Sequence, residues 1–272
     1  MAYPDDFIPE IWSTSILDNL KKALVLPNIV DLTYAGDIAN VGDTVRIQGP
    51  TQLTAATYTD GVTTVTYGNP SSTTRSLVID KDYYVSFGVD DLDEVQSNVD
   101  LLTLYTRESA YALAKQIDTS IADEYTNAAL AGITVTIGTT DVYDAVIDAR
   151  TNLEAADNTG DYFVVVNPAM YGAMLKNNTF VSAEGDGAQV RRTGVVGAIG
   201  GMDVYVSNNL AVAAGTTYGL YGSYTAIAHA RQLIGQPEAI RLESSFKTGI
   251  RARMAWGNKV VDGNRLGTFD IA

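Results

Sequence analysis

Residues 97–129, SNVDLLTLYTRESAYALAKQIDTSIADEYTNAA, form the stretch that decides the fold. Apolar side chains recur along it at helical spacing, which predicts one long amphipathic helix. Ser97 suits the N-cap, and several aspartates lie just before it, where the helix dipole favours negative charge. At 1.5 Å per residue the helix is roughly 45 Å long, so it is expected to act as a spine. Its apolar row consists of Leu101, Tyr105, Leu113, Ile117, Ile121 and Tyr125.

A shorter amphipathic helix is predicted at residues 9–25, PEIWSTSILDNLKKALV. Apolar residues recur every four positions from Trp12 to Leu24, and Pro27 ends the pattern. Because only one stripe of this helix is apolar, it needs another surface to pack on.

Residues 41–89 are rich in Thr, Val and Tyr, which predicts β-strands. One face of the later segment carries Leu77, Ile79, Tyr83, Val85 and Phe87 at a period of two. Large aliphatic residues are few between positions 48 and 75, so a hairpin there cannot build its own core. An isolated two-stranded hairpin is marginal in water. This segment is therefore expected to be either a loosely packed loop or an arm that lies on a neighbour.

Helices and strands alternate after the long helix. A helix is predicted at residues 140–157, and the apolar run at 161–166 predicts a buried strand. Asn167 and Pro168 then suit the cap and the first position of a short helix. Further strands are expected in MDVYVS, TTYGLYGS, TAIAHARQ, AIRLESSF and GIRARMAWGNKVVD. The pattern predicts an α+β or mixed α/β fold.

The composition limits the function. The 272 residues include no cysteine, which excludes disulfides and thiolate metal sites. The formal net charge is −14, which argues against free binding to nucleic acid, because such binding needs a basic face. Charge is also uneven: residues 231–272 carry a net +3 and residues 1–230 a net −17. This asymmetry is either a solvated surface or a sign that subunits meet through complementary patches.

No stretch carries a recognisable catalytic or ligand-binding set. Glycines at 194, 197, 200 and 201 are followed by a strand pattern, whereas a dinucleotide fingerprint precedes a helix; a tight turn is the expected role. His229, the only histidine, would have to serve any Ser-His-Asp triad, but a structural histidine is the simpler interpretation. The acidic residues 90–100 lack the spacing of a calcium loop and are expected to face the helix N-terminus.

Four stretches, in this order, resemble the major capsid proteins of tailed bacteriophages. The first is FIPEIWSTSILDNLKKALVLPNIV followed by GDTVRI, and the second is the long helix to Asn127. The third is YFVVVNPAMYGAMLKN with GVVGAIGGMDVYVSNNL, and the fourth is FKTGIRARMAWGNKVVDGNRLGTF. The resemblance covers nearly the whole chain.

The resemblance implies the α+β capsid fold of these phages. The expected parts are an N-terminal arm at 1–45, an extended β-hairpin loop at 46–88 and a peripheral domain with the spine helix at 89–135. An axial domain at 136–238 and closing strands of the peripheral domain at 239–272 complete the fold. The glycines are then a turn of the axial domain, and the hairpin is expected to lie on the adjacent subunit.

The implied function is that of a structural, non-enzymatic major capsid subunit in the virion, assembled in the host bacterial cytoplasm. Expected partners are other copies of the chain in hexamers and pentamers, a separate scaffolding protein, a portal and possibly a decoration protein. The shell encloses double-stranded DNA without sequence-specific binding, and neither cofactor nor metal is expected. The alternatives are an encapsulin-type compartment shell and, remotely, an enzyme using His229. Candidates for inter-subunit contact are Trp12, Tyr67, Arg75, Arg251 and Arg253.

Overall fold

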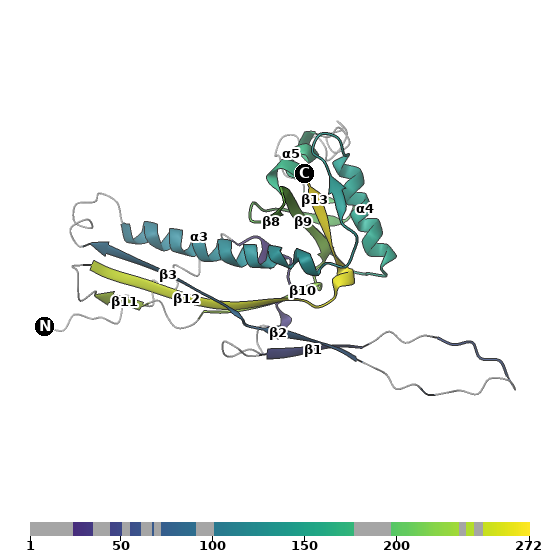
Figure 1. Cartoon of the computed structure of the whole chain (residues 1–272), viewed down its shortest axis with the longest axis horizontal. Helices are drawn as coiled ribbons and strands as arrows, with labels where there is room; N and C mark the ends of the chain where they lie inside the picture. The colour runs from purple at the N-terminus through teal and green to yellow at the C-terminus, as the bar shows by residue number, and fades with distance from the viewer. Residues whose placement is uncertain are drawn as a thin grey trace.

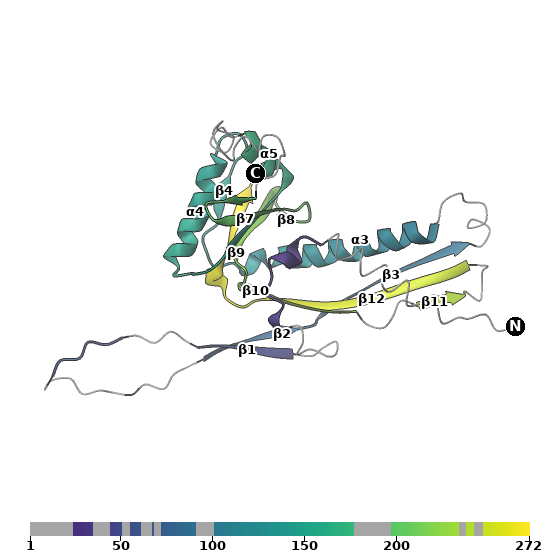
Figure 2. The same ribbon diagram turned by 180° about the vertical axis from the view of Figure 1, so that it is seen from behind.

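The computed structural model describes residues 24–34, 44–50, 55–60, 67, 72–90, 101–176, 197–233, 238–241 and 247–272. Within these ranges the chain forms a long flat body with a compact unit standing on one end of it (Figure 1, Figure 2). A narrow hairpin runs along the other side of the body and projects beyond that end.

The body consists of the spine helix lying along a four-stranded antiparallel sheet (Figure 1). The helix α3 spans Leu101–Ala122 and is followed by the 3₁₀ turn η3, Asp123–Asn127. The 22 residues of α3 extend about 33 Å, and the end of the predicted helix is wrong because residues 123–127 tighten into a 3₁₀ turn. Residues 97–100 lie outside the described residues. The strands of this sheet are β10 (Ile227–Leu233), β12 (Lys247–Val260), β11 (Glu238–Arg241) and β3 (Lys81–Asp90).

The predicted apolar row of α3 forms much of its contact with the sheet. Leu113, Ile117 and Ile121 are buried in one core with Trp256. Tyr105, nearer the start of the helix, remains 45% exposed although its ring lies 5.7 Å from that of Phe87. The spine is therefore held most tightly in its C-terminal half.

A chain of buried hydrogen bonds also links α3 to the sheet. The Ser120 Oγ accepts from Trp256 Nε1 and from Asn258 Nδ2, each at 2.8 Å, and donates to the Ile117 carbonyl at 2.8 Å. The Asn258 Oδ1 in turn lies 2.6 Å from His229 Nδ1. Because the Asn258 amide nitrogen donates to Ser120, its oxygen accepts, and the imidazole donates from Nδ1.

The compact unit is a seven-stranded mixed sheet covered by two helices (Figure 2). The predicted helices are confirmed as α4, Val142–Ala155, and α5, Pro168–Lys176. Asp141 accepts from the Tyr143 amide at 2.9 Å, and Asn167 accepts from the Met170 amide at 2.8 Å. The predicted buried strand is β5, Tyr162–Val166, which pairs with β7 (Met202–Val206) and β9 (Thr216–Ser223). The remaining strands are β4 (Ile133–Val135), β6 (Ala198–Ile199), β8 (Ala211–Ala213) and β13 (Leu266–Ile271).

The described part of the N-terminal segment is fastened to the spine. The 3₁₀ helix η1, Leu26–Asn28, has its Leu26 amide 3.3 Å from the carboxylate of Asp118, which also accepts from Asn209 Nδ2 at 3.2 Å. Desolvation raises the pKa of this buried carboxyl group. The predicted helix at 9–25 lies outside the described residues except for its last two positions.

The hairpin is a separate two-stranded antiparallel sheet of β1, Thr44–Pro50, and β2, Ser72–Val78. Its inner face contributes Ile47 and Leu77 to a small core, which Ile79 joins from just beyond β2. That core is completed by Ala228, Ala230 and Ala255 from the body sheet. Among the described residues, the hairpin's apolar contacts with the body thus lie at its base.

Three predicted boundaries need correction. The segment 46–88 was expected to be one loop, but β3 pairs with β12 along ten positions and belongs to the body. The strand β10 falls within the predicted axial segment 136–238 yet also pairs with β12. The strand β13 was expected to close the peripheral domain but pairs with β4 and β9 in the compact unit. Backbone pairing between distant segments, which local sequence patterns do not specify, decides each case.

Candidate functional site

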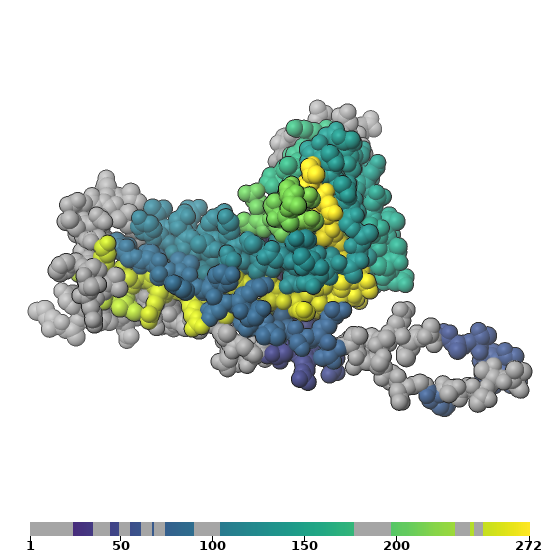
Figure 3. Space-filling model, viewed as in Figure 1, coloured from purple at the N-terminus to yellow at the C-terminus, as the bar shows by residue number. Residues whose placement is uncertain are grey.

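The hairpin loop has little of its own chain to pack against. Residues 51–71 join β1 to β2, and their described parts stand clear of the body in all three whole-chain views (Figure 1, Figure 2, Figure 3). Tyr58 is 62% exposed and Tyr67 is 92% exposed. Exposed aromatic side chains on a projecting segment are typical of a surface that another molecule covers.

A glycine fixes the crossing between hairpin and body. At the end of β2 the backbone of Val78 and Ile79 passes directly over Gly257 of β12. A Cβ atom on Gly257 would lie 2.8 Å from the Val78 carbonyl carbon and 3.1 Å from the Ile79 Cα. Because these are backbone atoms, a side chain here would displace the hairpin rather than rotate a neighbour away.

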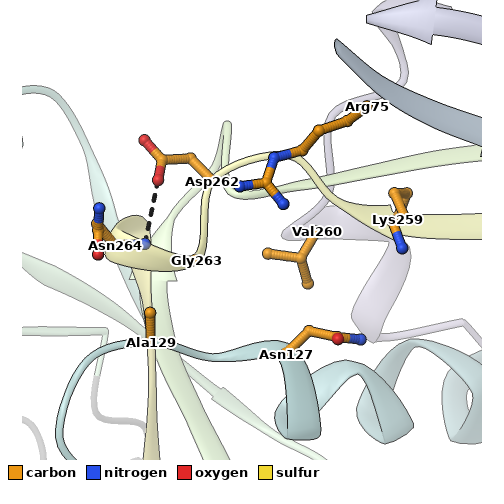
Figure 4. A pocket seen from close by; sticks show the side chains of 8 residues that line it. All are labelled: Arg75, Asn127, Ala129, Lys259, Val260, Asp262, Gly263 and Asn264. Atoms are coloured by element: carbon orange, nitrogen blue, oxygen red, sulfur yellow. Dashed lines mark hydrogen bonds between the residues drawn. The ribbon is translucent and has the colours of Figure 1, made fainter. Parts of the chain in front are cut away.

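A polar cavity lies beside this crossing, with a volume of about 200 Å³ (Figure 4). Its walls come from the hairpin, the end of η3, the end of β12 and the 3₁₀ turn η4, Gly263–Arg265, which leads into β13. The cavity therefore lies where the hairpin, the end of the body sheet and the link to the compact unit meet. The lining residues are Arg75, Asn127, Ala129, Lys259, Val260, Asp262, Gly263 and Asn264.

Two cations border this cavity. Arg75, one of the predicted contact residues, pairs in register with Ile47, so its side chain leaves the hairpin on the face that packs toward the body. Figure 4 shows its guanidinium extending over the cavity, with Lys259 on the far side of Val260. The cavity's own carboxylate, Asp262, is engaged by Arg265 at 3.3 Å and accepts from the Asn264 amide at 3.1 Å.

The other predicted contact residues lie elsewhere. Arg253 is held within the chain by both carboxylate oxygens of Asp82, and this hydrogen-bonded pair lowers the pKa of Asp82. Arg251 borders a second groove of about 460 Å³ with Phe87, Ile240 and Ile250 on the body sheet. Trp12 lies outside the described residues. Of the four candidates that the structure describes, Arg75 alone lines the cavity.

His229 lies far from solvent. Its side chain is fully buried, its Nδ1 is bound to an amide rather than a carboxylate, and its Nε2 has no partner among the described residues. Burial lowers its pKa to about 4, and the nearby charges of Arg231 and Lys81 act in the same direction. A neutral imidazole enclosed in this way has no route to a substrate.

The glycine-rich stretch is a turn, as predicted. Gly200 and Gly201 have φ angles of +55° and +78° and join β6 to β7 as a two-residue hairpin connection. Arg150 donates to the Gly200 carbonyl, so the turn is fixed to α4 from one side. Gly194 lies outside the described residues.

Two further classes of site were sought in the described part of the chain. No group of three or more histidine, cysteine or acidic side chains there is placed to hold a metal ion. None of the described helices is long and apolar enough to cross a membrane.

Sequence reasoning missed Lys259 and the buried polar chain through Ser120. The single available signal was positional: Ser120 follows the apolar position Ile117 by three residues and therefore shares its side of the helix. Lys259 stands in a strand pattern between Asn258 and Val260 and gives no local sign that it borders a cavity.

A flat body, a compact unit on one end and a hairpin that projects past it define a class of protein: a subunit shaped to overlap its neighbours in a larger assembly. The comparisons identify the family. The sequence pattern described as phage capsid protein matches residues 81–268, and the chain belongs to this family. It is accordingly a structural protein of the phage capsid. No curated protein matches the chain.

Solved structures agree with this assignment. A chain from Mycobacterium phage Che8 is 29% identical, with a TM-score of 0.77 and 90% of each chain covered. The capsid of cyanophage P-SCSP1u is 17% identical, with a TM-score of 0.72, covering 92% of this chain and 88% of that one. A virus-like particle from Pyrococcus furiosus is 14% identical, with a TM-score of 0.61, covering 97% and 100%. The predicted capsid fold is confirmed.

Proposed function

We propose that this chain is the major capsid subunit of a tailed bacteriophage, and that its hexamers and pentamers close into an icosahedral shell around double-stranded DNA. The observation that carries the proposal is the family match across residues 81–268, which spans the body and the compact unit. The shape of the subunit supports it, because the exposed hairpin offers a surface that only a second molecule can cover.

In this proposal the hairpin lies on the adjacent subunit, and the compact unit corresponds to the axial domain around each capsomer axis. Assembly takes place in the host cytoplasm with a separate scaffolding protein and a portal, with a decoration protein as a possible addition. The net charge of −14 suits a shell that encloses DNA without sequence-specific binding, because binding to the phosphate backbone of DNA needs a basic face.

Neither the encapsulin-type compartment shell nor the enzyme using His229 is favoured over this proposal. A cellular compartment shell has the same fold, and the likeness to the Pyrococcus furiosus particle at 14% identity speaks for the fold alone. The match to the phage capsid family and the 29% identity to the chain from Mycobacterium phage Che8 favour a virion protein. The enzyme hypothesis loses its only histidine, since His229 is buried against Asn258.

Electron microscopy of the purified chain, alone and with its candidate scaffolding protein, tests the proposal. We expect closed shells, or irregular shells that become uniform when the scaffold is present. A 29.0 kDa monomer under every condition would overturn it. Release of DNA-filled particles from cells that also supply portal and packaging motor would distinguish a virion shell from a cargo compartment.

A further inference from the structure

We propose that the cavity at the base of the hairpin binds a carboxylate group from a second copy of this chain. The inference rests on the proposed function, because the second copy is the neighbouring subunit of the shell. It adds the site, the chemistry and the side chains of one particular contact.

The first argument is that the two cations, Arg75 and Lys259, have no ion-pair partner among the described residues. Neither Arg75 nor Lys259 forms a hydrogen bond or ion pair with any residue that the structure describes. Glu124 lies within electrostatic range of Lys259, but its carboxylate hydrogen bonds are to Asn127 and the Val260 backbone. The charged side chains that line the cavity are Arg75, Lys259 and Asp262, and Asp262 is engaged by Arg265, so the lining carries a net positive charge.

The second argument is the charge of the molecule that would approach. Residues 1–230 carry a net charge of −17, so a neighbouring copy presents mostly carboxylates. A positive recess on an acidic subunit is complementary to that surface, and such complementarity fixes the register of association. Arg75 offers a planar fork that matches a carboxylate, while Lys259 adds a point charge.

The third argument is size. A cavity of about 200 Å³ holds one side-chain carboxylate with a few waters, since each water occupies about 30 Å³. A DNA backbone would instead need a row of cations over several phosphates. Position matters as well: a group bound here lies between the hairpin, the end of η3 beyond the spine helix, the end of β12 and the link to the compact unit. The contact would therefore hold the hairpin at one angle to the body.

Zero-length cross-linking of assembled shells tests this directly. A water-soluble carbodiimide joins an amine to a carboxylate that touches it, so shells co-assembled from ¹⁴N and ¹⁵N chains report contacts between chains as mixed-isotope peptides. We expect a mixed-isotope adduct at Lys259. It should vanish in Lys259→Arg, which keeps the charge, and persist in Lys115→Arg, which alters an exposed lysine of the spine.

Charge reversal supplies the second measurement. Arg75→Glu should lower the yield of shells about tenfold or more, because a close interfacial ion pair is replaced by repulsion. Arg46→Glu is the matched control, since Arg46 lies exposed on the adjacent strand of the same hairpin, outside the cavity, and should change the yield less than threefold.

The outcomes separate the two proposals. If the wild-type chain forms no shells, the proposed function fails and the contact fails with it. If shells form but the Lys259 adduct is absent, or joins Lys259 to Glu124 of the same chain, the contact alone is overturned. Equal yields for Arg75→Glu and Arg46→Glu would also overturn it.

Discussion

Replacing Ser120 with alanine tests the buried hydrogen bonds that hold the spine helix on the body sheet. Among the residues that the structure describes, the Ser120 hydroxyl is the only acceptor for Trp256 Nε1 and Asn258 Nδ2, each at 2.8 Å and both buried. A buried donor left without an acceptor costs about 1–3 kcal/mol. Two such donors predict a loss of about 2–6 kcal/mol for Ser120→Ala, which also removes the bond to the Ile117 carbonyl.

Thr119→Ala is the matched control on the same turn of α3. The Thr119 hydroxyl also donates to a helix carbonyl, that of Lys115, but it lies at the exposed surface. Surface changes of this kind usually stay within about 0.5 kcal/mol. The two variants thus remove the same chemical group from adjacent residues, one inside the protein and one outside.

Urea unfolding of the unassembled subunit, followed by tryptophan fluorescence, measures the difference. With one of only two tryptophans in the network, the signal reports the affected region directly. Thermal unfolding should shift by about 4–24 °C for Ser120→Ala, given about 2–4 °C per kcal/mol for a chain of this size. Equal stability of the Ser120→Ala and Thr119→Ala subunits would refute the argument that this network carries the packing of the spine.

Two further predictions concern the hairpin crossing and the buried imidazole. Gly257→Ala should destabilise the subunit by about 1–3 kcal/mol, because the added Cβ meets backbone atoms. Gly172→Ala in α5 is the control: its Cβ would meet nothing within 4 Å, so it should be neutral or stabilising by up to about 1 kcal/mol. Equal thermal unfolding temperatures for the two variants would contradict this prediction. His229 has a pKa of about 4 when folded and about 6.5 when unfolded, so its contribution is complete above pH 6.5 and is lost as the pH falls toward 4. Between pH 6.5 and pH 4 the unfolding free energy of the wild type should therefore fall by about 3 kcal/mol more than that of His229→Gln. The variant is a suitable control because it retains the pH response of Asp118 and Glu124. Parallel curves of unfolding free energy against pH for the two proteins would contradict this prediction.

The sequence predicted those elements whose signals are local. The apolar run of β5 and the Asn167–Pro168 start of α5 each lie within the element that they specify. Sheet membership was harder, because β3 and β13 carry strand patterns that do not encode a partner. Their pairing with β12 and β9 joins segments that are distant in the chain.

The functional surface was predictable only in outline. The scarcity of large aliphatic residues in the hairpin predicted that it could not stand alone, and the structure shows its small core at the base. The cavity could not be predicted, because it forms where the hairpin crosses the body and brings Arg75 and Lys259 to one space. Polar residues such as Ser120 resemble surface residues in a sequence until their buried partners are known.

The net charge of −14 makes salt act on assembly in two opposite directions. Added salt screens the repulsion between acidic subunits, with a screening length of about 10 Å at 0.1 M ionic strength. Salt also weakens an exposed ion pair. If the Arg75 cavity receives a carboxylate of the neighbour, Arg75→Glu loses the attraction and adds repulsion at the contact itself. Its assembly, followed by light scattering, should therefore need more salt than that of Arg46→Glu, although both variants carry the same net charge. Superimposable salt curves for the two would mean that net charge alone governs the response, and that the cavity lies outside the contact between subunits.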